Sequence, residues 1–468
     1  MDPAGQLSRS LTLTHSTALV VGKVIGTGVF LKAAVMTQQT QSSKVMLMAW
    51  AAAGLLSLAG ALTYAELSAM YPEAGGEYVY LRAAYGRMAA FLCGWMQLVV
   101  AQSGVIAALS VGGATFLSAL IPINAVWVTR TIHLLGRDVN FQIGARQIVA
   151  VALIVVFSCV NCAGVALGGR IQTALTAAKV LGVIAIIGGV FFFSHQATWR
   201  NLGNGSGTEW VGLRAFGAAM FAALFAYNGW NNLPMAAGEV RDPGKTIPRA
   251  LIGGMLAVLG LYLLINLAYV YALPLDEVIA SNSTAYPAAL PVATRASETF
   301  LGASGSKFVS IVFVVSTIGT LNAGILAAAR IPFAMARDGL FPSGLRALGA
   351  RSHAPVRAIA IQAVWASVLA LSGSFDQLTD FAIFPLWLFF ALTASAVFVL
   401  RRKAPEAERP YRAFGYPVLP ALFILVACWL VVNTLMTNPV GSGAGLVMIA
   451  LGLPLYFYFR HRGSSSRN

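Results

Sequence analysis

Long apolar runs separated by short polar loops dominate the chain from residue 14 onward. A transmembrane helix needs about 20 mainly apolar residues. Twelve runs reach or approach that length, at residues 14–37, 46–70, 88–120, 147–167, 173–194, 214–240, 250–273, 306–329, 356–373, 379–400, 416–437 and 444–460. The runs are long rather than alternating stretches of about ten residues, so the pattern excludes a transmembrane β-barrel. We therefore predict an all-α membrane protein with twelve transmembrane helices.

Two of these runs are interrupted. The first contains "VGKVIGTGVF" (21–30), with three glycines and one lysine, and the sixth contains "FAYNGWNNLP" (225–234). A glycine weakens a helix interior by about 1 kcal/mol, and a lysine at mid-bilayer costs about 2.5–3.5 kcal/mol. Breaks at corresponding positions in two halves are typical of transporters built from inverted repeats, which bind substrate at the breaks. We predict five spans in each repeat and two further spans.

The breaks themselves indicate the substrate. Backbone groups freed by an unwound helix need polar partners inside a membrane. A half-helix starting after Gly28 offers amides and a positive dipole end to an anion. The half-helix ending near Val24 offers free carbonyls to a cation. A ligand with a carboxylate and an ammonium group a few ångströms apart satisfies both sets, and an α-amino acid is such a ligand.

Composition and charge agree with a membrane protein. The chain is 58% hydrophobic and 10% charged, whereas soluble domains average about a quarter charged residues. The net charge of +15 comes from basic residues in alternate loops, which twelve spans would put on one side together with both termini. The positive-inside rule then makes that side cytoplasmic. We expect a multi-pass protein of the cell (inner) membrane, surrounded by lipid, with no cleavable signal peptide and no nucleic-acid partner.

The expected organisation follows from these spans. It comprises a cytoplasmic tail (1–13), a first repeat (14–194), a second repeat (214–400), two further spans (416–460) and a second cytoplasmic tail (461–468).

Several longer stretches resemble one known family. They are "GTGVF" (26–30), "GALTYAELSAMYPEAGGEYVYLRAAYG" (60–86), "RIQTALTAAKVLGV" (170–183), "FAYNGWNN" (225–232), "GEVRDPGKTIPRAL" (238–251), "AARIPFAMARDGLFP" (328–342) and "RPYRAFGYPVLP" (409–420). In these the chain resembles the amino acid–polyamine–organocation (APC) superfamily, most closely its L-type amino acid transporter branch. The resemblance implies a five-plus-five inverted-repeat fold, alternating access, and a substrate site between spans 1, 3, 6, 8 and 10.

Carried over residue by residue, the resemblance assigns carboxylate contacts to Thr27 and the amides around it, and ammonium contacts to the carbonyls of Val24, Phe225 and Asn228. Phe225 is also the implied aromatic gate. The implied substrate site consists of Val24, Ile25, Gly26, Thr27, Gly28, Phe225, Ala226, Asn228, Gly229, Trp230, Asn231 and Trp387. Simple aromatic packing is the alternative for Phe225, Trp230 and Trp387. The expected apolar pocket wall contains Gln102, Ser103, Ile318 and Ala382.

Two lysines bear on ion coupling and on the charge of the substrate. The resemblance places the ammonium of Lys179 where sodium-coupled relatives hold sodium, bridging the first span to Ser316 or Thr320 of the eighth. That position implies sodium-independent transport, while snorkelling of Lys179 to the interface and proton coupling through it are the alternatives. Lys23 departs from the family pattern. It either pairs with a carboxylate such as Glu66 or reaches cytoplasmic water, or it filters substrates by charge.

The remaining polar residues indicate an inner gate and exclude several other functions. Glu66, Glu73, Glu77, Glu239 and Asp242 are expected to pair with Arg82, Arg241 or Lys245 as an inner gate. Neither a metal cluster nor a catalytic triad nor a phosphate-binding loop is visible, so we expect no metal, no cofactor and no enzymatic activity. The loop 121–146 lacks the cysteine through which eukaryotic L-type transporters bond a heavy subunit, so none is expected here.

The sequence therefore predicts a sodium-independent exchanger of neutral L-amino acids. A fixed charge at Lys23 would disfavour arginine and lysine, because two unit charges 4 Å apart repel by about 4 kcal/mol at an effective dielectric of 20. Proton-coupled symport is one alternative. An amino acid sensor without transport activity is a second one, which the lack of a soluble signalling domain disfavours.

Overall fold

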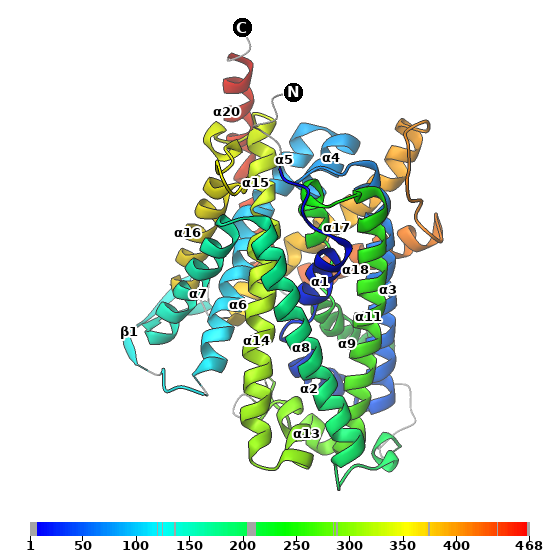
Figure 1. Ribbon diagram of the computed structural model, residues 1–468. Helices are drawn as coiled ribbons and strands as arrows, with labels where there is room; N and C mark the ends of the chain where they lie inside the picture. The colour runs from blue at the N-terminus through cyan, green and yellow to red at the C-terminus, as the bar shows by residue number, and fades with distance from the viewer. Residues whose placement is uncertain are drawn as a thin grey trace.

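The computed structural model describes residues 7–465 except 119, 124, 135–136, 204–211, 284, 287–288, 373–374 and 438. Its helices run along a common axis as a bundle (Figure 1). Among the described residues, ten helical segments are long and apolar enough to cross a membrane: Leu13–Thr40, Ser43–Met70, Arg87–Leu117, Ala145–Cys162, Val165–Phe193, Pro243–Ala272, Ser304–Arg337, Phe384–Lys403, Val418–Met436 and Pro439–His461. The protein is therefore a multi-pass membrane protein. Two shorter apolar helices, Gly212–Ala226 and Val356–Leu371, accompany them.

The helices of the first half are α1 (Leu13–Val24), α2 (Gly28–Thr40), α3 (Ser43–Met70), α4 (Glu77–Tyr85), α5 (Arg87–Met96), η2 (Gln97–Ala101), α6 (Gln102–Leu117), α7 (Ala145–Cys162), α8 (Val165–Phe193) and η3 (Trp199–Leu202). The later ones are α9 (Gly212–Ala226), α10 (Asn232–Met235), η4 (Ala237–Glu239), α11 (Pro243–Ala272), α12 (Leu275–Ile279), α13 (Val292–Leu301), α14 (Ser304–Ala328), α15 (Arg330–Arg337), η5 (Ser343–Arg346), α16 (Val356–Ser372), α17 (Phe375–Lys403), α18 (Val418–Thr437), α19 (Pro439–Ala450) and α20 (Gly452–Ser465).

Helical structure stops and restarts within the two interrupted segments. α1 ends at Val24 and α2 begins at Gly28, and α9 ends at Ala226 before the short helix α10. The segments meet closely, because a Cβ on Gly28 would lie 2.6 Å from the Cβ of Ala226. A Cβ on Gly26 would meet nothing nearer than 3.6 Å. Gly28 is therefore required by packing between the breaks, whereas Gly26 is not.

The third span contains a turn of π-helix. η2 (Gln97–Ala101) widens the helix just before α6, so that side chains five residues apart face each other. The Gln102 amide Nε2 donates to Gln97 Oε1 at 3.2 Å, and the Ser103 hydroxyl donates to the Leu98 carbonyl at 2.6 Å. Such bulges often occur at functional sites.

The loop 121–146 contains strands that the search for spans did not predict. β1 (Val126–Leu134) and β2 (Arg137–Gly144) pair antiparallel, with Thr131 opposite Asn140. β1 is rich in β-branched residues, a composition typical of strands, and in β2 apolar Val139, Phe141 and Ile143 alternate with polar residues. Both strands are too short to span a membrane.

The bundle has two distinct ends. α4, α15 and α20 lie at one end and α13 at the other (Figure 1). We call the first the α4 end. The basic loops of the sequence belong to this end.

Candidate functional site

A cavity lies at the meeting point of the two breaks. Helices α6, α14 and α17 complete its wall. Its lining residues are Lys23, Val24, Gly26, Thr27, Gly28, Ala101, Gln102, Val105, Ala108, Leu109, Phe225, Ala226, Asn228, Gly229, Asn232, Thr320 and Leu386. None of these lining side chains is a carboxylate.

Most residues expected at the substrate site line this cavity. Those that do are Val24, Gly26, Thr27, Gly28, Phe225, Ala226, Asn228 and Gly229. Four others face elsewhere: Ile25, Trp230, Asn231 and Trp387. Of the expected pocket wall, Gln102 lines the cavity, Ser103 and Ile318 do not, and the side chain of Ala382 is outside the described part of the chain.

Trp230 and Trp387 belong to an aromatic cluster. The Trp230 ring lies 4.7 Å from the ring of Tyr64 and 5.7 Å from that of Phe390, measured between centroids. Trp387 contacts the same Phe390 ring, at 5.5 Å, and the ring of Phe423 in α18, at 6.2 Å. Both tryptophans thus pack against other helices instead of lining the cavity, which is the alternative open from the sequence.

One wall of the cavity offers backbone amides. α2 begins at Gly28, and its N-cap residue Thr27 makes no side-chain capping bond. The first amides of an α-helix have no acceptor within the helix, and the helix dipole adds partial positive charge there. Thr27 and Gly28 both line the cavity. This wall can therefore hold a carboxylate.

The opposite wall offers carbonyls, and Tyr262 fixes two of them. The buried Tyr262 hydroxyl of α11 lies 2.9 Å from the Val24 carbonyl oxygen and 3.1 Å from that of Ala226. One side chain thus links the last residue of α1 to the last residue of α9. Each carbonyl keeps a second lone pair for a ligand. Tyr262 is not predicted from the sequence, because nothing in the apolar run of α11 marks it.

Phe225 lies between the cavity and a second lysine of the first span. The Lys32 ammonium is 4.9 Å from the centroid of the Phe225 ring. A cation over an aromatic face is attracted by the ring quadrupole. The contact links α2 to α9 beside the cavity, which Phe225 lines.

Lys179 of α8 is fully buried and fully hydrogen-bonded. Its ammonium donates to the carbonyls of Gly22 (2.7 Å), Ile25 (2.8 Å) and Ser316 (2.8 Å), and contacts the Thr320 hydroxyl oxygen at 3.1 Å. The Ser316 hydroxyl also donates to the Ile25 carbonyl, at 2.9 Å. Lys179 therefore joins the first break to α14. Because it lies inside the bundle, it does not snorkel to the interface.

Lys23 is arranged differently. Its side chain is 5% exposed, and its ammonium has no hydrogen-bond partner among the described residues. Glu66, the predicted partner, instead binds arginines at the α4 end. The expectation that Lys23 pairs with Glu66 or reaches water is therefore wrong. Lys23 lines the cavity.

Asn231 connects the second break to the α4 end. Its amide Nδ2 donates to Glu77 Oε1 at 2.7 Å, and both residues are buried. Burial raises the pKa of the Glu77 carboxyl to about 7, although the Asn231 hydrogen bond acts to lower it. Glu77 Oε2 has no partner among the described residues.

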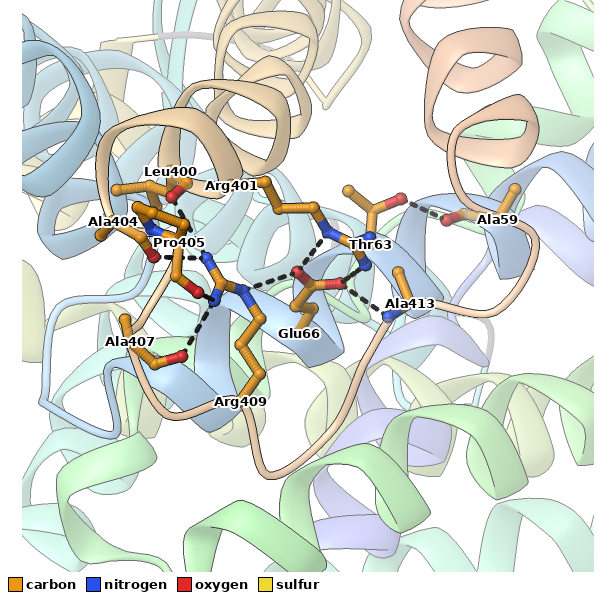
Figure 2. A network of polar contacts seen from close by, with 10 residues as sticks. All are labelled: Ala59, Thr63, Glu66, Leu400, Arg401, Ala404, Pro405, Ala407, Arg409 and Ala413. Carbon is orange, nitrogen blue, oxygen red and sulfur yellow. Dashed lines mark hydrogen bonds and ion pairs between the residues drawn. The ribbon is translucent and has the colours of Figure 1, made fainter.

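Three groups of ion pairs close the α4 end. Figure 2 shows the first: Glu66 of α3 accepts from Arg401 at 2.6 and 2.9 Å and from the Ala413 amide at 2.6 Å, with Arg409 3.6 Å away. Arg401 reaches Glu66 from the last turn of α17, and Arg409 and Ala413 reach it because the chain after α17 folds back over the end of α3.

The other two groups involve α15 and its C-terminal flank. Arg330 is fully buried and makes bonds of 2.8 and 2.9 Å to the two carboxylate oxygens of Glu239. Arg82 pairs with Asp338 and with Glu73. The predicted partner Arg82 is thus confirmed for Glu73 alone, whereas Arg241 donates its Nε to the Arg9 carbonyl.

Comparison with known proteins agrees with this architecture. The family profile described as "Amino acid permease" matches residues 11–459. The chain is 30% identical to the serine/threonine exchanger SteT of Bacillus subtilis, over 98% of each chain. It is also 30% identical to the human cystine/glutamate transporter, over 98% of this chain and 87% of the relative.

A third relative belongs to the L-type branch. The mouse large neutral amino acids transporter small subunit 2 is 28% identical, over 97% of this chain and 82% of the relative. These matches confirm the resemblance inferred from the motifs, and they make the chain a transporter and not an enzyme. The protein belongs to the amino acid permease family of the APC superfamily.

Proposed function

We propose that this protein is a sodium-independent exchanger of neutral L-amino acids that works by alternating access. The observation that carries the proposal is the cavity between the two breaks, with amides of α2 on one wall and carbonyls of Val24, Phe225 and Ala226 on the other. A zwitterionic backbone has the charge pattern that complements these walls. The names of the relatives add amino acid transport and, for one of them, serine/threonine exchange.

In the proposed complex the backbone of the substrate bridges the breaks. Its carboxylate accepts from the amides at Thr27 and Gly28, where the dipole of α2 stabilises negative charge. Its ammonium donates to the second lone pairs of the carbonyls at the ends of α1 and α9. Phe225 covers the bound molecule. The side chain then points toward α6 and α17, whose lining residues Val105, Leu109 and Leu386 favour apolar groups.

Sodium independence is proposed from Lys179. Its ammonium takes the carbonyls of Gly22, Ile25 and Ser316, and carbonyl oxygens are the ligands that a sodium ion would need. A fixed cation there leaves no coordination for a second one. The same geometry supports proton coupling as a second candidate, because no carboxylate is among the hydrogen-bond partners of Lys179 and a buried lysine can lose its proton.

The proposal includes topology and assembly. α9 with the segment to residue 240 forms the sixth span and α16 the ninth, which gives twelve spans in two inverted repeats of five plus two. The two repeats comprise residues 14–194 and 214–400. The α4 end, which carries the basic loops, faces the cytoplasm with both termini. The protein works without a disulfide-linked heavy subunit.

Counterflow in proteoliposomes tests this function. Vesicles loaded with an unlabelled neutral amino acid should take up labelled neutral amino acid in sodium-free buffer, at a rate that added sodium does not change. Empty vesicles should take up little. Uptake that requires a sodium gradient would refute the Lys179 argument. Net uptake into empty vesicles driven by an inward proton gradient would replace exchange with proton symport.

A further inference from the structure

Lys23 occupies a slot that only glycines leave open. A Cβ on Gly229 of the second break would lie 2.7 Å from Lys23 Cγ. A Cβ on Gly324 of α14 would lie 2.7 Å from Lys23 Nζ. The stem of the lysine therefore passes the second break and its ammonium lies against the eighth span. Any larger residue at either position would displace it.

The ammonium in this slot has no counter-charge within the described part of the protein. Its Nζ is buried and without a hydrogen-bond partner there. The buried carboxylates are engaged elsewhere: Glu66 with Arg401, Glu239 with Arg330, and Glu77 with Asn231. An unpaired buried ammonium is unfavourable. The buried ammonium of Lys179 in α8 has four oxygen partners. The absence of hydrogen-bond partners is therefore specific to Lys23 and not common to both buried lysines.

The missing anion can come with the substrate. Lys23 lines the same cavity as Thr27 and Gly28. The Lys23 ammonium lies beside this cavity, against Gly324 of α14. The amides of α2 already provide for the α-carboxylate, so a further cation at the cavity wall calls for a second anionic group. A neutral amino acid leaves the ammonium unpaired, whereas a side-chain carboxylate neutralises it. Gln102 and Asn232 also line the cavity, and their oxygens Oε1 and Oδ1 have no hydrogen-bond partner among the described residues.

We propose that Lys23 binds the side-chain carboxylate of an acidic amino acid, so that aspartate or glutamate is a substrate in addition to the neutral ones. This inference rests on the proposed transport function and extends its substrate range. Lys23 then does more than exclude cationic side chains: it selects anionic ones.

The counterflow vesicles also test this inference. Unlabelled aspartate and glutamate should compete for uptake of a labelled neutral amino acid into wild-type vesicles. In Lys23→Thr, the apparent affinity for the better acidic substrate should fall about 30-fold or more relative to that for the neutral one, because one partner of a buried charge pair is lost. Lys307→Thr, which removes an exposed lysine of α14, is the matched control and should keep the wild-type ratio.

A second variant and a binding measurement protect the test against misfolding. Lys23→Met keeps the length of the side chain without its charge and should show the same fall in the ratio. Purified wild-type protein should melt at higher temperature with aspartate or glutamate, because a ligand of the native state stabilises it. That shift should be smaller in both Lys23 variants.

Three outcomes would overturn the inference. Neutral exchange without competition by either acidic amino acid leaves the proposed function intact and removes the role of Lys23. A ratio of the apparent affinities for acidic and neutral substrates that is retained in both Lys23 variants and lost in Lys32→Thr would show that the side-chain carboxylate binds the Lys32 ammonium over Phe225 and not Lys23. Absence of exchange for every amino acid rejects the transport function, and the inference falls with it.

Discussion

Tyr262 holds the two breaks together with one hydroxyl group. That hydroxyl contacts the carbonyl oxygens of Val24 and Ala226, at 2.9 and 3.1 Å, deep in the bundle. The chain ends of α1 and α9 would otherwise be free to separate. A single residue of α11 thus determines the spacing of the wall that we assign to the substrate ammonium.

Tyr262→Phe should weaken both stability and transport. Removal of the hydroxyl takes away the donor that the two buried carbonyls share. A buried carbonyl without its donor costs about 1–3 kcal/mol of stability. We expect a lower melting temperature and a higher apparent KM for neutral amino acids. Tyr269→Phe is the control on the same helix, because its buried hydroxyl has no partner among the described residues. Equal effects of the two substitutions would show that the hydroxyl of Tyr262 does not position the site.

Residues of this site differ in how visible they are from sequence. Thr27 and Phe225 could be placed in the cavity because glycines and polar residues interrupt their spans. Tyr262 could not, since a tyrosine in an apolar helix has no local signature. The partners of Glu66 were predicted wrongly for a related reason. Arg401 and Arg409 lie more than 300 residues away, and only the packing of the end of α17 and of the chain after it against α3 brings them to Glu66.

At the scale of elements, the two broken segments depend on close contact between α2 and α9. Gly28→Ala would place a methyl group 2.6 Å from Ala226 Cβ and 2.8 Å from Ala226 Cα. Overpacking of this kind costs about 1–3 kcal/mol, so melting temperature and exchange rate should both fall. Gly253→Ala, in α11 with nothing within 4 Å of the new methyl group, should be neutral or stabilise by about 0.5–1 kcal/mol. A Gly28→Ala variant as stable as wild type would mean that the breaks do not need this contact.

The short helix α4 supplies a pH-dependent contact to the second break. Burial raises the pKa of the Glu77 carboxyl from 4.5 to about 7. The folded protein therefore binds a proton that the unfolded chain releases. As pH rises from about 4.5 to 7, the free energy of unfolding falls by about 3 kcal/mol from this group, and below 4.5 its contribution is fully present.

Glu77→Gln should remove this dependence. The neutral amide keeps an oxygen that accepts from Asn231 and carries no proton to lose. Melting curves in detergent at pH 5, 6.5 and 8 should show that the variant is more stable than wild type at pH 8 and nearly equal to it at pH 5. Glu73→Gln, on the more exposed side of the α4 end, serves as the control. An unchanged slope in Glu77→Gln would assign the pH dependence to another group.

Element types were easier to predict from sequence than their local detail. Long apolar runs identify the spans because a helix must satisfy its backbone inside a membrane. The π-turn at Gln97–Ala101 and the hairpin at Val126–Gly144 left no comparable signal. The π-turn only lengthens the spacing of the backbone hydrogen bonds from four residues to five, within an apolar run. The second is an ordinary alternating pattern that is too short to span a bilayer.

At the scale of the whole molecule, the α4 end is closed by ion pairs of unequal burial. The pair Glu239–Arg330 is completely buried, whereas the side chains of Glu73 and Arg82 are 46% and 28% exposed. Exposed pairs contribute about 0–1 kcal/mol. Breaking a buried pair by removing one partner costs about 3–5 kcal/mol, because the other charge is left uncompensated. The closure of this end therefore depends mainly on Glu239 and Arg330, which join the segment after the second break to α15.

A double-mutant cycle can separate these contributions. Glu239→Gln alone should lower stability strongly, and Glu239→Gln combined with Arg330→Met should recover part of the loss, since no unpaired charge remains. Glu73→Gln should change stability by less than about 1 kcal/mol. If the α4 end must open during transport, the double variant should also exchange amino acids at a rate different from wild type at equal protein level. A double variant no more stable than Glu239→Gln would show that the cost lies in packing around Glu239 and not in the buried charge of Arg330.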